Sequence, residues 1–399
     1  MMKKVLFLTP YNPFEHPLGA ASQSVAYRLA HLAEIAEVEV ITFPSPRDTG
    51  NRSEGLKSIA KHIVLPPPQV SEERSSVLRL YRVLSGRLKL FGQMANLAAA
   101  LGGKAASLMD RNTYDLIHID DVIIHGAADY CPPSQRKIFF FHNLMTLQYR
   151  NLYRSRRTVL KKILAFVEYL HIKSHERKAL SSMETIVVLT PPEEKIVRIL
   201  SPHTTVFRIP LEVDLNLYRP DPGVAKPYHL LFTGTMSYEP NREGAVYFIE
   251  KIFPLIRDAC PQTRLFIVGM NPPKDLLALA NDNVIITGAV PSIIPYLKEA
   301  AVIVVPLLTG GGMRFKILEA FAMAKAVVST SVGAEGIEWE RERNIAIADE
   351  PVAFAEAVIG LLHNPQRAQD LGREARILIE RVYATEVVKH QWQDLYRCL

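Results

Sequence analysis

The chain has 399 residues, of which 48% are hydrophobic and 22% charged, and its formal net charge is +6. This length exceeds one ordinary hydrophobic core, so two globular domains are expected. No run of about 18 apolar residues is present to span a membrane. Three cysteines, Cys131, Cys260 and Cys398, lack disulfide or metal-site spacing, which favours a reducing, cytoplasmic compartment.

The first half of the sequence alternates short apolar runs with helical patterns. Strands are expected at 5–9, 38–43, 62–66, 115–119, 137–142, 185–189 and 205–209. Helices are expected at 22–33, 74–110 and 156–180. This alternation is typical of a parallel sheet covered by helices on both faces.

A proline-rich segment at 201–229 marks a junction, after which a second alternation begins. Strands are expected at 229–234, 263–268, 284–287, 302–306, 326–329 and 344–348, with helices at 245–258, 352–363, 366–382 and 386–396. The sequence therefore predicts an α/β protein of two Rossmann-like, doubly wound domains facing across a cleft, 1–205 and 206–384. The final helix, within 385–399, is expected to cross back to the first domain. Ligands of such domains bind at the carboxyl ends of the strands.

The most informative motif is VIVVPLLTGGGMRFKILE at 302–319, where a buried strand runs into Gly310, Gly311 and Gly312. A helix is expected to begin near Met313. The free N–H groups and the dipole of a helix N-terminus bind phosphate, and glycines let the backbone approach it closely. Two cations beside these amides, Arg314 and Lys316, suggest a diphosphate, and Glu319 one turn later suggests a ribose diol. The pattern indicates a nucleotide-sugar site.

Each of these residues also has a purely structural interpretation. Arg314 and Lys316 could be solvated surface charges, and two residues apart they do not share a helix face. Arg314 is the preferred diphosphate ligand because it is nearer the glycines and its guanidinium matches phosphate geometry. Glu319 could simply favour the N-terminal half of its helix through the dipole.

Two segments together, FTGTMSYEPNREGAVYF and GGGMRFKILEAFAMAKAVVSTSVGAEG, resemble glycosyltransferases of the GT-B architecture, specifically the large retaining family 4. The resemblance covers almost the full length. It implies a nucleotide-sugar donor, such as a UDP-sugar, bound mainly by the second domain. It also implies an acceptor hydroxyl bound mainly by the first domain, net retention at the anomeric carbon, and neither a cofactor nor an obligatory metal.

Carried over residue by residue, the resemblance assigns the donor to the second domain. Glu319 matches the family glutamate that holds the ribose, whereas Gly311 stands where the family has a first glutamate near the donor sugar. Thr235, after Gly234, replaces an arginine on the diphosphate, so that task is expected to move to Arg314 and Lys316. The other donor-binding candidates are Gly310, Gly312, Met313 and Glu335. Asn241, in the later region where the family has a lysine, is equally well explained as the N-cap of the helix through Ala245.

In the first domain the resemblance singles out a loop and a strand end. Gly19 matches a glycine-containing loop that approaches the transferred sugar, although an ordinary strand–helix turn explains it equally well. His142 matches a strand-end histidine near the donor sugar and is grouped with Arg314 and Lys316 as catalytic, against the interpretation of a structural histidine. Asp120 and Asn143 are acceptor-side candidates, and no third ligand completes a metal site with the aspartates.

The segment 150–178 mixes Lys and Arg with Leu, Ile, Phe and Tyr. A basic amphipathic helix is a candidate for an anionic membrane surface, the inner face of the cell membrane in this case, but its apolar stripe could equally face its own core. No nucleic-acid module is present. The acceptor is expected to be lipid-linked or a glycan, in glycolipid or cell-surface polysaccharide synthesis. Two other functions remain open: a non-catalytic nucleotide-sugar binder, and a nucleotide-sugar epimerase of the same architecture.

Overall fold

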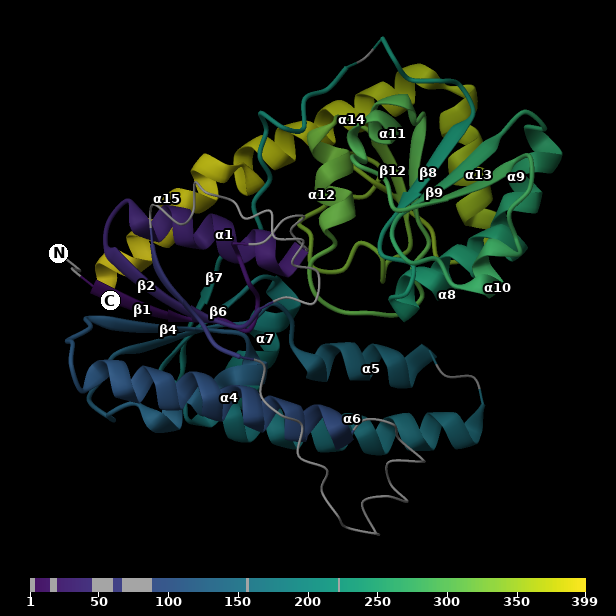
Figure 1. The fold of residues 1–399 in the computed structure, drawn as a ribbon. Helices are drawn as coiled ribbons and strands as arrows, with labels where there is room; N and C mark the ends of the chain where they lie inside the picture. Colours follow the sequence, from purple (N-terminus) through teal and green to yellow (C-terminus); the bar gives the residue numbers. More distant parts are fainter. Residues whose placement is uncertain (1–3, 15–19, 45–59, 67–87, 156–157, 222) are drawn as a thin grey trace. The chain divides into compact units, whose positions relative to one another are not determined.

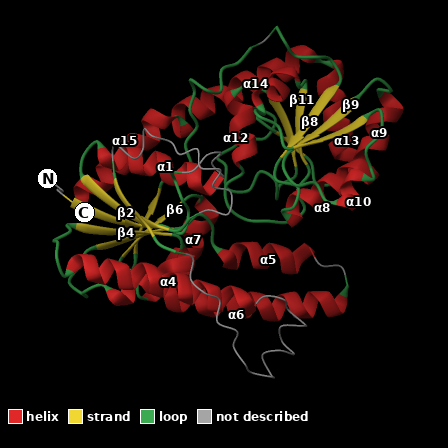
Figure 2. Ribbon diagram, viewed as in Figure 1, coloured by secondary structure: helices red, strands yellow, loops and turns green. Residues whose placement is uncertain are grey.

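The computed structural model describes residues 4–14, 20–44, 60–66, 88–155, 158–221 and 223–399. The chain divides into two compact units. Unit 1 contains Met1–Leu144, Ile172–Ile209 and Lys389–Leu399, and unit 2 contains Met145–His171 and Pro210–Val388. Figure 2 shows the strands gathered into two separate sheets, each flanked by helices. This organisation confirms the predicted α/β class with two Rossmann-like sheets.

The sheet of unit 1 has seven parallel strands in the order β3-β2-β1-β4-β5-β6-β7. Their bounds are β1 Lys4–Leu8, β2 Glu37–Thr42, β3 Lys61–Val64, β4 Leu116–Asp120, β5 Lys137–Phe140, β6 Thr185–Val188 and β7 Thr205–Arg208. Strand order reverses between β1 and β4, so the connections that follow these two strands leave in opposite directions. The crevice between them, at the carboxyl ends of the strands, is where doubly wound sheets bind ligands. β4 is buried along its whole length and β1 from Val5 onward, because both faces of the sheet are covered.

The helices of unit 1 are α1 Ala20–Ala33, α4 Leu88–Met109, the 3₁₀ segment η1 Val122–Tyr130, α7 Pro191–Leu200, and parts of α6 Val159–Ser181 and α15 Thr385–Cys398. In Figure 1, α1 and the end of α15 cover one face of this sheet and α4 covers the other. Trp392 and Tyr396 of α15 are buried, and the Tyr396 hydroxyl lies 2.9 Å from Nδ1 of His118. The last turns of the chain therefore complete the first unit's core.

The sheet of unit 2 has six parallel strands in the order β10-β9-β8-β11-β12-β13. They are β8 His229–Thr233, β9 Arg264–Val268, β10 Val284–Gly288, β11 Val302–Val305, β12 Ala326–Ser329 and β13 Ala346–Ile347. The helices are α5 Met145–Ser155, the first half of α6, α8 Glu239–Tyr247, the π-helix η2 Phe248–Ile252, α9 Phe253–Ala259, α10 Lys274–Leu277, α11 Ile294–Glu299, α12 Phe315–Ala322, α13 Pro351–His363, α14 Pro365–Leu378 and the π-helix η3 Ile379–Tyr383. The order reverses between β8 and β11, which makes their carboxyl ends the second ligand crevice.

The structure departs from the predicted helices at three places. The helix expected at 245–258 is interrupted by a π turn next to Pro254, which has no N–H to donate within a helix. Helix α5 was not predicted, and neither was α7, although Thr190 and Glu193 form a capping box there with prolines in the first turn. Only 88–109 of the helix expected at 74–110 lies among the described residues.

The unit boundaries also differ from those predicted. Residues 145–171, expected in the first domain, cluster with unit 2. The chain therefore enters unit 2 twice, first through α5 and the start of α6 and again after Ile209.

Candidate functional site

In unit 2, the loop after β8 is shaped by two glycines. Gly234 has φ +152°, in the region that favours glycine. A Cβ atom on Gly269 would lie 1.7 Å from the Gly234 carbonyl oxygen, so the loops after β8 and β9 approach each other more closely than any side chain permits. The result is a backbone turn, followed by Thr235, that is bare of side chains at the strand end.

Lys316, in the first turn of α12, reaches the same turn. Its Nζ donates a hydrogen bond to Oδ1 of Asn241 at 2.7 Å and lies 4.3 Å from the centroid of the Phe232 ring. A Cβ on Gly234 would come within 2.9 Å of this nitrogen. Burial, reinforced by the positive charge of Arg314, lowers the pKa of Lys316 to about 7, and Glu319 opposes the shift. An anion at the end of β8 would meet this ammonium group directly.

Asn241 fixes the lysine in this position. It is buried, and its Nδ2 donates to the Thr235 carbonyl oxygen at 3.0 Å while its Oδ1 accepts from Lys316. The N-cap role predicted for Asn241 is wrong, because α8 begins at Glu239 and its N-cap is Tyr238. Asn241 instead links the turn after β8 to α12.

Glu319 lies one turn beyond Lys316 and accepts a hydrogen bond from the Tyr218 hydroxyl at 2.6 Å. Burial raises the pKa of Glu319 to about 7, against the opposing effects of the Tyr218 hydrogen bond and of Lys316. A hydrogen bond to a diol would favour the ionised carboxylate. The sequence identified Glu319 but gave no indication of Tyr218, which is 101 residues away along the chain.

Arg314, predicted as the preferred diphosphate ligand, contacts the glycine loop itself. It precedes α12 as the N-cap, is buried, and donates from Nη1 to the Gly311 carbonyl oxygen. A Cβ on Gly310 would come within 2.8 Å of its Nη2. Arg314 is therefore folded onto the glycine loop, whereas Lys316 faces the turn after β8, so of the two cations it is Lys316 that has the geometry expected of a phosphate ligand.

The glycine loop adopts conformations that require its composition. Gly310 has φ +122° and Gly312 has φ +76°. A Cβ on Gly311 would lie 3.3 Å from backbone and side-chain atoms of Gln148 on α5. Helix α5 thus occupies the space into which a side chain at 311 would project, which gives a physical reason for the missing glutamate. Met313, the remaining predicted residue of this loop, is half-buried against the core of unit 2.

Glu335, after β12, is held by α5 as well. Its Oε2 accepts a hydrogen bond from Nδ2 of Asn151 at 2.7 Å, and its Oε1 lies 3.8 Å from Nη2 of Arg150. The same Asn151 nitrogen donates to the Gly310 carbonyl oxygen at 2.9 Å. Asn151 therefore joins Glu335 to the glycine loop, a role that no pattern in the sequence indicates because the partners are 184 and 159 residues apart.

In unit 1, the crevice between β1 and β4 contains a buried charged network. Asp120, at the end of β4, pairs with Arg28 of α1, accepts from Oγ1 of Thr9 at 3.0 Å, and lies 3.2 Å from Nε2 of His142. Burial alone would raise the pKa of Asp120, but the charges of Arg28 and His142 hold it well below its usual range. Arg28 also stacks 3.8 Å from the centroid of the Phe140 ring.

This network corrects one prediction. Asp120 has no exposed surface with which to contact an acceptor, and its Oδ2 lies 3.2 Å from Nε2 of His142, where it can orient that ring. His142 and Asn143 remain partly accessible at the end of β5. Asp121 is bound by the Tyr11 hydroxyl at 2.6 Å and caps η1. Gly19 lies outside the described residues.

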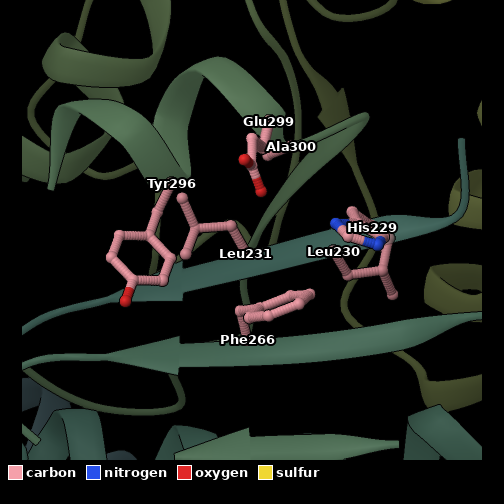
Figure 3. A pocket seen from close by; sticks show the side chains of 7 residues that line it. All are labelled: His229, Leu230, Leu231, Phe266, Tyr296, Glu299 and Ala300. Atoms are coloured by element: carbon pink, nitrogen blue, oxygen red, sulfur yellow. The ribbon is translucent and has the colours of Figure 1, made fainter. Parts of the chain in front are cut away.

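Within the described ranges, no group of three or more His, Cys, Asp or Glu side chains is arranged to hold a metal ion. A small pocket near the amino end of β8 is shown in Figure 3 and is lined by His229, Leu230, Leu231, Phe266, Tyr296, Glu299 and Ala300. It begins at the first residue of β8, the opposite end of that strand from Gly234, and so is separate from the site described above.

Comparison with known proteins identifies the second unit. Residues 227–364 match the family model of glycosyl transferases group 1. A 44.6-kDa uncharacterised protein of the cps region of Klebsiella pneumoniae is 24% identical over 265 residues, which are 64% of this chain and 67% of that protein.

Solved structures with the same fold match over the whole chain. Sucrose-phosphate synthase from Thermosynechococcus elongatus superposes with a TM-score of 0.74 at 19% identity, covering 100% of this chain and 98% of that one. HepE from Anabaena, in complex with UDP and glucose, has a TM-score of 0.69 at 14% identity, with 100% of both chains covered. The resemblance to group 1 glycosyltransferases is thereby confirmed for residues 227–364, and the GT-B fold for the whole chain.

The buried pair in unit 1 allows a double-mutant test. Replacing Asp120 by Asn leaves Arg28 buried without its carboxylate and should lower the free energy of unfolding by about 3–5 kcal/mol. Arg28→Met should also destabilise, and the double variant should lose clearly less than the sum, as measured by urea denaturation. The exposed pair Arg397–Asp394 provides a control, since Arg397→Met should change stability by less than about 0.5 kcal/mol. Additive effects of the Asp120 and Arg28 substitutions would contradict the coupling.

The packing of α5 on the glycine loop makes a prediction about the family glutamate. Gly311→Glu, which restores that residue type, should lower the melting temperature and any donor-dependent activity, because the new side chain must displace Gln148. Gly360→Glu is a matched control, since a Cβ there meets no atom within 4 Å. A Gly311→Glu protein that is as stable and as active as Gly360→Glu would show that α5 does not fill this space.

Proposed function

With a group 1 glycosyl transferase domain at residues 227–364 on the GT-B fold, we propose that this chain transfers a hexose from a nucleoside-diphosphate sugar to an acceptor hydroxyl. The observation that carries the proposal is the position of Lys316. A half-buried ammonium, bonded to an amide and stacked on a ring, faces the bare backbone turn at the switch point of the sheet. The UDP bound by HepE supports a nucleoside diphosphate, with UDP as the first candidate.

The residues of unit 2 divide the donor between them in this proposal. The turn at Gly234 and Thr235 and the ammonium of Lys316 bind the diphosphate. Glu319 binds the ribose hydroxyls. Its Oε1 accepts from Tyr218, so its Oε2 is the oxygen assigned to the ribose. The transferred sugar is contacted by the loop Gly310–Gly312 and by Glu335. Arg314 holds that loop in its conformation.

The proposed reaction breaks the bond between the anomeric carbon and the diphosphate oxygen and forms a bond to the acceptor oxygen. Lys316 stabilises the negative charge that develops on the leaving diphosphate, the largest contribution such a site offers. The acceptor attacks from the face that the diphosphate leaves, and a diphosphate oxygen takes the acceptor proton, which gives net retention without an enzyme nucleophile or a metal.

Unit 1 supplies His142, whose ring is held by Asp120, to orient the transferred sugar, and Asn143 contributes to acceptor binding. The relative from the cps region of Klebsiella supports a role in cell-surface polysaccharide synthesis, with a glycan or lipid-linked acceptor. A cytoplasmic location is part of the proposal, and all three cysteines are free in the structure. A nucleotide-sugar binder or an epimerase of the same architecture would not liberate diphosphate, which separates these functions experimentally.

The lowered pKa of Lys316 predicts a pH dependence of binding. Lysine is cationic below its pKa, so attraction for a nucleoside diphosphate is present near pH 7 and is lost as the pH rises through the pKa. The affinity for UDP should fall by up to about tenfold between pH 7 and pH 8.5, with proton uptake on binding. Isothermal titration calorimetry in two buffers of different ionisation enthalpy measures both effects.

Lys316→Arg is the matched variant, because an arginine stays charged over this range. Its affinity for UDP should be nearly independent of pH, and Lys316→Met should bind poorly at every pH. A wild-type affinity that does not change between pH 7 and pH 8.5 would contradict the assignment of Lys316 to the diphosphate.

The function itself is tested by ligand-induced stabilisation. The melting temperature is measured with UDP, GDP, ADP and TDP and their sugar conjugates, since a ligand of the folded state raises it by mass action. One nucleoside diphosphate should stabilise the wild type and not Glu319→Ala, whereas the exposed control Glu356→Ala should respond like the wild type. Release of that diphosphate from its sugar conjugate then demonstrates cleavage of the donor's anomeric bond, with water as acceptor, and NMR of the product's anomeric proton tests retention. Stabilisation without any release would favour a binder.

A further inference from the structure

The first half of α6 exposes a set of large apolar side chains. Seven residues between 159 and 170 each have between 40% and 73% of their surface exposed: Val159, Leu160, Ile163, Leu164, Phe166, Val167 and Leu170. We refer to these seven as the apolar face of α6. Single exposed apolar residues are ordinary, but a contiguous set marks an interaction surface.

The seven residues lie on one side of the helix. Val159, Ile163, Phe166 and Leu170 follow the three- and four-residue spacing of one stripe, and Leu160, Leu164 and Val167 form the adjacent one. On the opposite side, Ala165 and Ile172 are buried and Glu168 and Tyr169 are half-buried. The alternative that the apolar stripe faces the protein's own core is therefore wrong for this half of α6.

The charges around this face have one sign. The segment 145–178 contains nine Lys or Arg and two Glu, a net charge of +7. Among the α6 side chains whose burial is described, the exposed charged ones are Lys162, Arg177 and Lys178, all basic, whereas Glu176 is fully buried. The Lys162 ammonium also lies 5.6 Å from the centroid of the Tyr153 ring, and Tyr153 packs against Phe166.

We propose that the apolar face of α6 inserts into the surface of an anionic lipid bilayer, with the helix in the plane of the membrane and its basic residues on the headgroups. No helix in the described part of the chain is long and apolar enough to cross a bilayer, so insertion is interfacial. A second copy of the chain is a poorer occupant, because self-association through this face would bring two segments of charge +7 together. Anionic headgroups complement the same charges.

The proposal is tested by vesicle sedimentation of the full chain. Wild type should bind phosphatidylcholine vesicles that contain phosphatidylglycerol, bind pure phosphatidylcholine weakly, and be released by salt. Ile163→Ser together with Val167→Ser should lower the partition coefficient on the anionic vesicles at least about tenfold, because two inserted side chains are lost. Lys161→Gln with Lys162→Gln should lower the partition coefficient on anionic vesicles about fivefold or more, because two positive charges are removed.

The matched control replaces exposed apolar residues elsewhere, Ile199→Ser with Val352→Ser, and should leave vesicle binding unchanged. Because the substituted apolar residues and Lys162 are exposed, thermal unfolding of these variants should be similar to that of the wild type. Leu160→Trp provides a second readout, since its fluorescence should shift to the blue with anionic vesicles, and Ile199→Trp should not. Equal binding by wild type and the Ile163–Val167 variant, or a lipid-free dimer that this variant abolishes in sedimentation velocity, would overturn the proposal. None of these readouts needs donor or activity, so they stand independently of the proposed function.

Discussion

The unit 2 site depends on a lysine that is bonded to a neutral partner. The Lys316 ammonium is paired in the structure with the Asn241 amide and the Phe232 ring, neither of which carries a charge. Burying an ammonium without a counter-charge is costly, which is why its pKa falls. The free-energy cost of burying the Lys316 ammonium falls at the carboxyl end of β8, where an anionic ligand would offset it. The glycines around it have the complementary role, because any Cβ at Gly234 would collide with the lysine or with Asn241.

At the equivalent position in unit 1, the strand-end crevice contains a buried anion, Asp120, in place of a cation. Asp120 is at the carboxyl end of β4, beside the switch point, and is surrounded by donors from β1, α1 and β5. Its charge is fully compensated, so this crevice holds a rigid network, with His142 as its accessible member. The same fold thus carries a cation whose hydrogen-bond partner is neutral in one unit, and an anion paired with an arginine in the other.

Much of this architecture could be predicted from the sequence because it depends on local pattern. Strands such as β11 and β12 are short apolar runs between polar turns, and Gly310–Gly312 directly precede α12. Glu319 and Lys316 could be proposed from the sequence because they follow that loop at fixed spacing. Their partners were not, since Tyr218 and Asn241 are 101 and 75 residues away and neither has a distinctive local motif.

Two predicted residues have surroundings that differ from those expected, for equally physical reasons. Arg314 was preferred to Lys316 on proximity to the glycines, but the same proximity lets it bond to the loop's own carbonyl. Asp120 was placed at the acceptor because it ends a strand, and only the positions of Arg28 and Thr9 show that it is buried. Helix α5 is polar and aromatic, and its packing on Gly311 is a tertiary feature.

The path of the chain has a consequence for how the protein is made. The core of unit 1 includes Trp392 and Tyr396, which pack against Phe140 and His118, and Gln393 of the same helix donates to Glu34. All the strands of unit 1 are synthesised before Pro210, but the side chains that close its core come last. During synthesis, the apolar core residues of unit 1 that α15 covers therefore stay exposed until the second unit, which ends at Val388, has been synthesised. The second unit can fold during this time. The core of the unit that begins first is therefore completed only after the second unit has been synthesised.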